Sequence, residues 1–156
     1  TFGCMFAPDQ DAVASELLRV TKPGGKIGMA NFPADSLAGG FFRSAARYQI
    51  PPRGVKPATN WGTKEWLETT FGPHASNIEI VRKAVMLRYQ SAQHWLDFFT
   101  KWFGPIGTVY EKLNDAKKER FGNDLKQLVI DANISGDDTI VAPVYYSQVI
   151  ITKSNA

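Results

Sequence analysis

The sequence has little of what marks secreted or membrane proteins. Cys4 is the only cysteine, so no disulfide can form within the chain, and this fits a reducing compartment. No apolar run approaches the roughly 18 to 20 residues of a membrane span. No charged segment followed by an apolar core marks a signal peptide either. We therefore expect a soluble, cytoplasmic protein without a membrane span.

The chain also lacks a strong excess of charge. Its 18 Lys and Arg against 15 Asp and Glu give a net charge of +3, and the basic residues are scattered. A nucleic-acid surface would need them clustered on one face, so we expect no nucleic-acid partner. The apolar share of 44% and the charged share of 21% over 156 residues indicate one globular domain.

The common signatures of phosphate-binding and hydrolytic enzymes are absent. The sequence contains no Gly-x-Gly-x-x-Gly, no Gly-x-x-x-x-Gly-Lys-[Ser/Thr] and no Gly-x-Ser-x-Gly, so neither a phosphate loop nor a nucleophile elbow is supported. His74 and His94 have no neighbouring cysteines, so no metal site is expected. Cys4 adjoins apolar residues and is predicted to be a buried hydrophobe rather than a nucleophile.

The first part of the chain predicts strand, helix and strand. Residues 1–6 form an apolar run closed by Pro8, which we interpret as the end of a buried strand. Residues 9–21 carry an apolar stripe of helical period, with acidic residues first and basic residues last. After a Pro-Gly-Gly turn, residues 26–32 predict a strand buried on both faces of a parallel sheet.

The middle of the chain changes character. Residues 33–60 contain paired glycines, several prolines and a possible short helix, and we expect them to form an inserted, lid-like segment. Thr63 is placed to cap a helix that ends at a Gly-Pro pair. Alternating apolar residues over 78–89 then predict one bent strand or two short ones.

The last part predicts a helical block over residues 91–135, inserted before a final strand. Ser91 opens a helix whose aromatic residues share one stripe, and Asn114 is placed to cap a later helix. The final strand is predicted near residues 146–152, because Pro143 is awkward in a central strand. The aromatic stripe fits either a core face or the wall of an apolar pocket, and the sequence leaves both open.

Two strings resemble the second half of the class I S-adenosylmethionine-dependent methyltransferases. They are Phe-Gly-Cys-Met-Phe-Ala-Pro-Asp at residues 2–9 and Glu-Leu-Leu-Arg-Val-Thr-Lys-Pro-Gly-Gly-Lys-Ile at residues 16–27. Further along, Trp61-Gly62-Thr63, the break at Phe103-Gly104-Pro105 and the terminal strand resemble a bacterial small-molecule branch, related to the ubiquinone and menaquinone biosynthesis methyltransferases. The resemblance covers residues 2–153.

The resemblance implies an α/β fold, the C-terminal half of a Rossmann-like sheet. It would hold a remnant of strand 4 and then strands 5 to 7, with added helices, in a single partial domain over residues 1–156. Members of the family carry a glycine-rich cofactor loop and an acidic ribose-binding residue ahead of this region, and the chain has neither. We therefore expect a fragment that alone binds S-adenosylmethionine weakly or not at all and is inactive.

The resemblance also implies site residues. The loop containing Gly3, Cys4, Met5 and Phe6 would border the methionine part of the cofactor. The lid and the aromatic helix would close over a small apolar or aromatic acceptor, with the expected contacts Phe42, Trp61, Phe98, Phe99 and Trp102. Methyl transfer is an in-line displacement that depends mainly on alignment and exclusion of water, so no catalytic residue is named.

A sheet that lacks its first strands exposes an edge, and an exposed edge invites another chain. We therefore expect a homo-oligomer. Two other functions compete with the methyltransferase fragment. One is a non-enzymatic α/β module that binds an apolar ligand or a protein. The other, ranked third, is a nicotinamide oxidoreductase, which would also need a glycine fingerprint.

Overall fold

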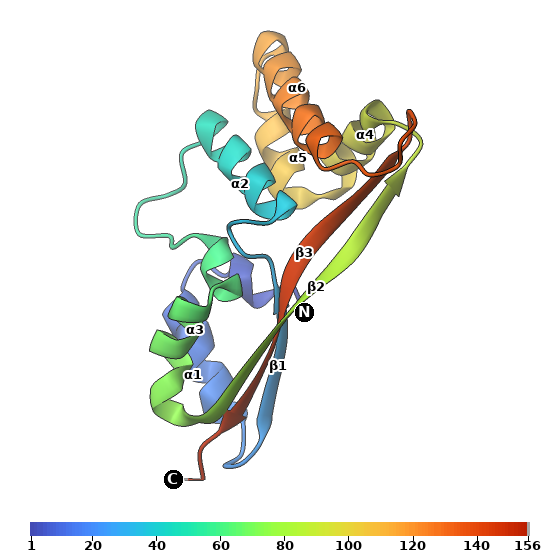
Figure 1. Ribbon diagram of the computed structural model, residues 1–156. Helices are drawn as coiled ribbons and strands as arrows, with labels where there is room; N and C mark the ends of the chain where they lie inside the picture. Colours follow the sequence, from blue (N-terminus) through green and yellow to red (C-terminus); the bar gives the residue numbers. More distant parts are fainter. Residues whose placement is uncertain (156) are drawn as a thin grey trace. The chain divides into compact units, whose positions relative to one another are not determined.

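The protein is mixed α/β. The computed structural model describes residues 1–155 (Figure 1). Along the chain these form η1 (Cys4–Phe6), α1 (Gln10–Val20), β1 (Lys26–Asn31), α2 (Leu37–Tyr48), η2 (Ala58–Gly62), α3 (Lys64–Phe71), η3 (Gly72–His74), β2 (Ala75–Tyr89), α4 (Ala92–Trp102), α5 (Gly104–Glu111), α6 (Asp115–Asp131) and β3 (Ile140–Lys153), where η marks a short 3-10 helix.

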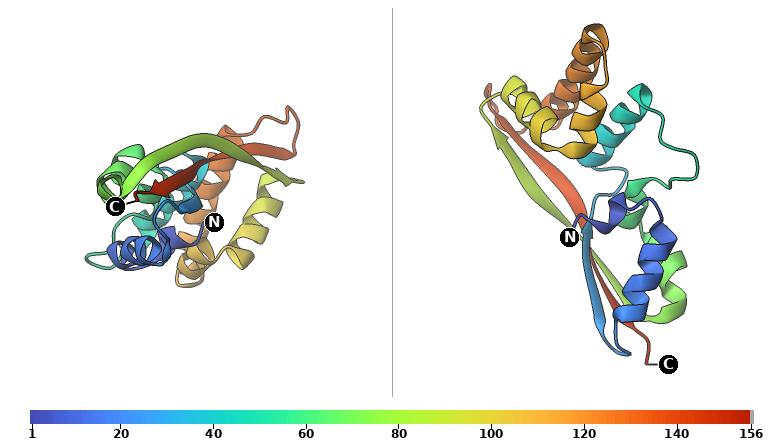
Figure 2. Two further views of the ribbon diagram at one scale, coloured as in Figure 1. Left: turned by 90° about the horizontal axis from the view of Figure 1, so that it is seen from below. Right: turned by 180° about the vertical axis from the view of Figure 1, so that it is seen from behind.

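The sheet of the described chain has three strands in the order β1-β3-β2, so the last strand in sequence lies in the middle (Figure 2). β3 pairs antiparallel with β1, in a register that runs from Lys26 opposite Thr152 to Asn31 opposite Ser147. The predicted parallel pairing of residues 26–32 was therefore wrong. An apolar run buried on both faces has the same pattern whichever direction its neighbour takes, so the pattern did not determine the direction.

The chain divides into two compact units. Unit 1 contains residues 1–36, 53–83 and 145–155, and unit 2 contains residues 37–52 and 84–144. The lid-like segment predicted at 33–60 is thus shared, because residues 37–52 belong to unit 2 and the rest to unit 1.

Each unit has a core of its own. In unit 1 the fully buried side chains include Met5, Trp61, Leu67, Phe71 and Ile151. In unit 2, α2 and α4 each pack against both α5 and α6. The side chains buried among these helices include Phe41, Trp95, Ile106, Phe121 and Leu125.

Side-chain caps explain where three of the helices begin. The carboxylate of Asp9 accepts a hydrogen bond of 2.9 Å from the backbone N–H of Ala12 at the start of α1. Ser91 and Asn114 cap α4 and α6 in the same way, as predicted. Thr63 stands at the N-cap position of α3, but its hydroxyl donates to the carbonyl of Asn60 instead.

Two predicted strand boundaries were wrong. Residues 1–6 are not a strand, because Phe2 takes a left-handed φ of 54° and Cys4–Phe6 turn into η1. β3 begins at Ile140 and includes Pro143, ahead of the predicted residues 146–152. The pairing of β3 with β1 ends at Ser147, so Pro143 lies where β3 has no partner on the β1 side. Because no hydrogen bond to β1 is formed there, the N–H that proline lacks is not needed on that side. Of the two alternatives for residues 78–89, the structure has one strand, β2.

Candidate functional site

The carboxyl end of β1 in unit 1 gathers the residues that the sequence assigned to a cofactor. The backbone N–H of Phe2 donates a hydrogen bond of 2.8 Å to the carbonyl of Ala30, the next-to-last residue of β1. The rings of Phe2 and Phe32 stack with centroids 4.5 Å apart. These two contacts hold the first residues of the chain against the end of the strand, and η1 follows directly.

The four predicted cofactor residues differ in accessibility. Met5 is fully buried, Cys4 is half-buried, and Gly3 is exposed. Phe6 leaves 41% of its surface exposed. The accessible part of this segment is therefore the backbone at Gly3 and the ring of Phe6, while Met5 anchors the turn in the core.

Buried polar atoms without partners lie in the same unit. Asn31 ends β1 and Gln10 begins α1, and both side chains are buried. Gln10 donates from Nε2 to the carbonyl of Lys56 at 3.0 Å. Its Oε1, the Nδ2 of Asn31 and the indole Nε1 of Trp61 have no hydrogen-bond partner among the described residues. Such atoms are rare in proteins and often mark a place where a ligand or water is bound.

A close backbone approach forms another side of this region. η2 ends at Gly62, and a Cβ added there would lie 2.4 Å from the backbone nitrogen of Pro33. The hydroxyl of Ser147 in β3 donates to the carbonyl of Gly62 at 2.7 Å. Trp61, an expected acceptor contact, is fully buried and packs on Trp66 with ring centroids 4.5 Å apart.

The other four expected acceptor contacts lie in unit 2. Phe99 belongs to a continuous aromatic cluster, with ring centroids 4.8 Å from both Trp95 and Phe103. Phe42 joins the cluster through Phe103 at 6.3 Å. Phe98 and Trp102 point elsewhere, since 46% and 66% of their surfaces are exposed. The stripe thus serves partly as core and partly as surface.

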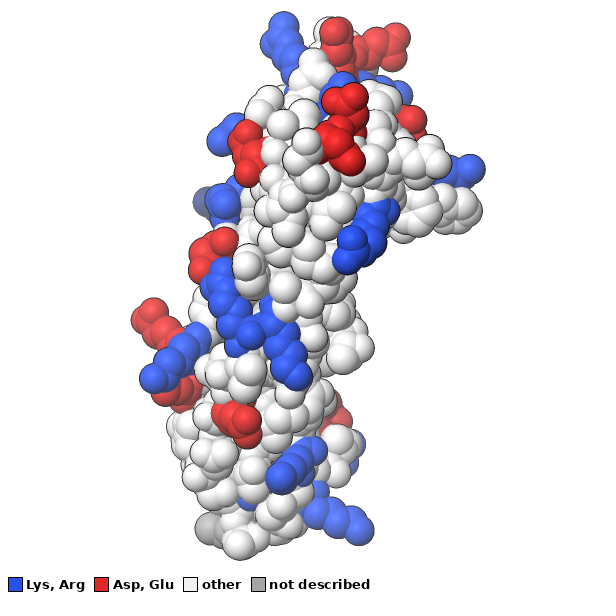
Figure 3. Space-filling view, turned by 45° about the vertical axis from the view of Figure 1, so that its right-hand side comes forward, with Lys and Arg blue, Asp and Glu red and all other residues white. Residues whose placement is uncertain are grey.

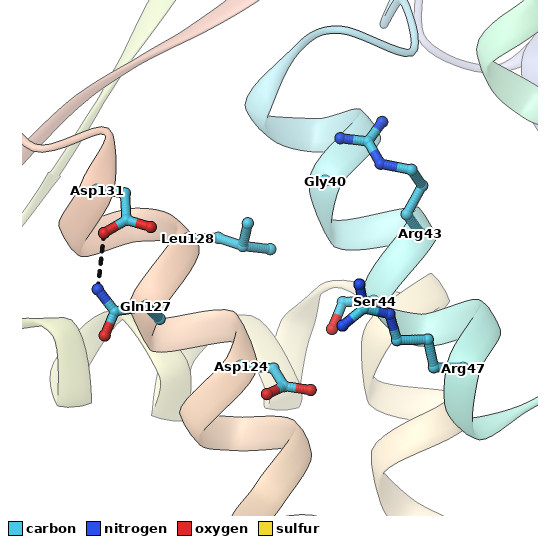
Figure 4. A pocket seen from close by; sticks show the side chains of 8 residues that line it. All are labelled: Gly40, Arg43, Ser44, Arg47, Asp124, Gln127, Leu128 and Asp131. Carbon is cyan, nitrogen blue, oxygen red and sulfur yellow. Dashed lines mark hydrogen bonds between the residues drawn. The ribbon is translucent and has the colours of Figure 1, made fainter.

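A groove in unit 2, which sequence reasoning missed, lies between α2 and α6 (Figure 4). It has a volume of about 290 Å³. α2 contributes Gly40, Arg43, Ser44 and Arg47, and α6 contributes Asp124, Gln127, Leu128 and Asp131. The spacing of the two arginines, four residues apart on a helix, was a visible signal, but nothing in the sequence showed that α6 faces them.

One titratable pair lies at this groove. The hydroxyl of Tyr48 donates to Oδ2 of Asp124 at 2.9 Å. Burial, and then the hydrogen bond to the Asp124 carboxylate and its negative charge, raise the pKa of Tyr48 above its ordinary value of 10.0. At neutral pH the tyrosine is therefore a hydrogen-bond donor.

Residues 1–155 hold neither a cluster of metal ligands nor a membrane-spanning helix. No group of three or more His, Cys, Asp or Glu in that range could hold a metal ion. None of the helices there is both long and apolar enough to cross a bilayer. Positive and negative side chains both occur over the face shown in Figure 3.

Comparison with known proteins gives relatives without a stated activity. No protein-family model matches the chain. The uncharacterized protein Rv1403c of Mycobacterium tuberculosis is 29% identical over 118 residues, which are 74% of this chain and 43% of that protein. The uncharacterized protein Rv1405c of the same organism is 29% identical over 115 residues, or 72% and 42% of the two chains. The chain thus spans less than half the length of these curated relatives.

Proposed function

We propose that the chain is the C-terminal portion of a class I S-adenosylmethionine-dependent methyltransferase acting on a small apolar or aromatic acceptor. The observation that carries this proposal is the hydrogen bond from Phe2 to Ala30, which holds residues 3–6 at the carboxyl end of β1. In open α/β sheets ligands bind outside the carboxyl ends of strands. The segment that resembles the family's cofactor loop is therefore where a ligand would be expected.

The finer fold assignment belongs to the same proposal. β1, β2 and β3 would be strands 5, 6 and 7 of a Rossmann-like sheet, and residues 1–3 the end of the connection from strand 4. Support comes from the Pro-Gly-Gly turn between α1 and β1, where Gly24 takes a left-handed φ of 69°. The greater length of the mycobacterial relatives leaves room in them for a glycine-rich loop.

The residues present fit the cofactor by their chemistry. S-adenosylmethionine supplies an electrophilic methyl group next to an amino acid moiety. Phe6 offers an exposed ring, and the unpartnered Nδ2 of Asn31 and Oε1 of Gln10 are a donor and an acceptor. Both atoms are buried within unit 1. What the chain contributes is orientation and exclusion of water.

The test is a calorimetric titration of S-adenosylhomocysteine into this chain and into a longer chain that continues upstream of Thr1. The proposal expects micromolar binding by the longer chain and weak or no binding by the shorter one. In the longer chain, Phe6→Ala should weaken binding, whereas Val20→Ala, another exposed apolar residue of unit 1, should not. If the longer chain does not bind, the non-enzymatic module becomes the better description.

Homo-oligomer formation stays part of this proposal. β1 and β2 are the outer strands of the described sheet, and an outer strand offers unpaired backbone groups to a second copy. Light scattering at micromolar concentration tests the prediction directly, and a monomeric mass would contradict it.

A further inference from the structure

The groove between α2 and α6 has walls of opposite charge. Arg43 and Arg47 line it from α2, and Asp124 and Asp131 line it from α6. The four formal charges sum to zero. A ligand with charge of a single sign would therefore meet repulsion from one wall as well as attraction from the other.

Arg47 and Asp131 do not form an ion pair with each other across the groove. Arg47 forms no ion pair or hydrogen bond with any residue in the range 1–155. Asp131 accepts one hydrogen bond, of 2.7 Å at Oδ1, from Gln127 on its own helix. Figure 4 shows the Arg47 guanidinium extended into the space between the helices and the Asp131 carboxylate on the opposite wall.

A buried hydroxyl at the groove has no partner. Ser44 lines the groove between Arg43 and Arg47 and is only 4% exposed, and its Oγ makes no hydrogen bond in the described part of the chain. A buried hydroxyl without a partner has lost its hydrogen bonds to water and gained none in return. A bound oxygen atom would restore one.

From these features we infer that the groove binds a small zwitterion, with its carboxylate at Arg47 and Ser44 and its ammonium group at Asp131. A guanidinium matches a carboxylate through two parallel hydrogen bonds, and a carboxylate accepts from an ammonium group. A volume of about 290 Å³ suits a molecule of amino acid size. This inference does not rest on the methyltransferase proposal, because all the groove residues belong to unit 2.

The experiment is an NMR titration of the chain with a series of linear ω-amino acids: β-alanine, γ-aminobutyrate and ε-aminocaproate. Propionate, butyrate and hexanoate and the matching primary amines are the singly charged controls. The amide signals of Ser44 and Gln127 report binding. We expect one member of the series to bind at least about tenfold more tightly than both of its singly charged analogues.

Matched variants localise the binding. Arg47→Gln should reduce the affinity of the best ω-amino acid to the affinity of the matching primary amine. Asp131→Asn should reduce it to the affinity of the matching carboxylate. Arg53→Gln and Asp138→Asn change exposed residues outside the groove. These two control variants should leave the affinity for the ω-amino acid unchanged. All four positions are exposed, so folding should survive, as circular dichroism would verify. Equal affinity for zwitterions and singly charged analogues, or no effect of Arg47→Gln, would overturn the inference.

Discussion

The hydroxyl of Ser147 donates a hydrogen bond of 2.7 Å to the carbonyl oxygen of Gly62, and both residues are buried. Ser147 is also the residue of β3 that stands opposite Asn31, where the pairing with β1 ends. One side chain thus joins the end of the strand pair to η2, the turn that covers the end of β1. The geometry of the candidate cofactor region depends on this contact.

Ser147→Ala should lower the free energy of unfolding by about 1–2 kcal/mol, because it leaves a buried carbonyl without its donor. Urea denaturation followed by circular dichroism measures the change. Ser76→Ala is the control, since the Ser76 hydroxyl makes an exposed bond of 3.3 Å to Thr152 and its loss should cost less than about 0.5 kcal/mol. Equal effects of the two variants would show that the hydrogen bond to Gly62 contributes no more to the free energy of unfolding than an exposed one does.

Gly62→Ala should destabilise the chain by about 3 kcal/mol, because the added Cβ would collide with backbone that has no room to move. The nearest atoms would be the nitrogen of Pro33 at 2.4 Å and the carbonyl carbon of Phe32 at 2.6 Å. Gly72→Ala is the matched control, since nothing lies within 4 Å of a Cβ there. The same urea experiment compares Gly62→Ala with Gly72→Ala. If Gly62→Ala were tolerated, the close approach of Gly62 to the backbone of Phe32 and Pro33 would be contradicted.

Asn114→Ala should cost about 1 kcal/mol by removing the cap of α6, whereas Asn114→Asp should retain most of it. The side-chain oxygen of Asn114 accepts from the backbone N–H of Lys117 at 3.0 Å, and aspartate keeps that acceptor. Thermal unfolding of the three proteins tests the prediction. Were Asn114→Asp as damaging as Asn114→Ala, the cap would not be the cause.

Asp124→Asn should lower the pKa of Tyr48 toward its ordinary value without reaching it, because burial, the largest cause of the upward shift, remains. A raised pKa favours the protonated phenol in the folded state. The associated stability is therefore present below pH 10 and lost as the pH rises through the pKa of the folded protein. A ¹³C NMR titration of the Tyr48 ring measures it. Asp131→Asn, on the same helix, should leave the Tyr48 titration as it is.

Local signals were sufficient to predict many of the elements. Ser91 and Asn114 are N-caps because a short polar side chain precedes an apolar stripe, and both the residue and its pattern are local. Thr63 had the same local signal, yet its hydroxyl bonds backward to Asn60. The position of the helix was predictable from sequence, and the geometry of its first turn was not.

Pairing between distant residues could not be predicted in the same way. The antiparallel partner of residues 26–31 is at 147–152, and no local pattern specifies that choice. The groove between α2 and α6 could not be predicted for the same reason. Arg47 and Asp131 line one site only because their two helices face each other in the folded chain. The aromatic stripe gave an ambiguous answer because it has both roles, with Trp95 buried and Trp102 exposed.

The central position of β3 has a consequence for the order of folding during synthesis. All residues of unit 2 precede residue 145, so its helices can pack as soon as they leave the ribosome. β1 is made much earlier but has to wait for residues 147–152, its partners in the sheet. Until then its backbone groups are open to other chains. The time for which the β3-facing edge of β1 stays exposed is therefore set by the translation of the residues between β1 and β3.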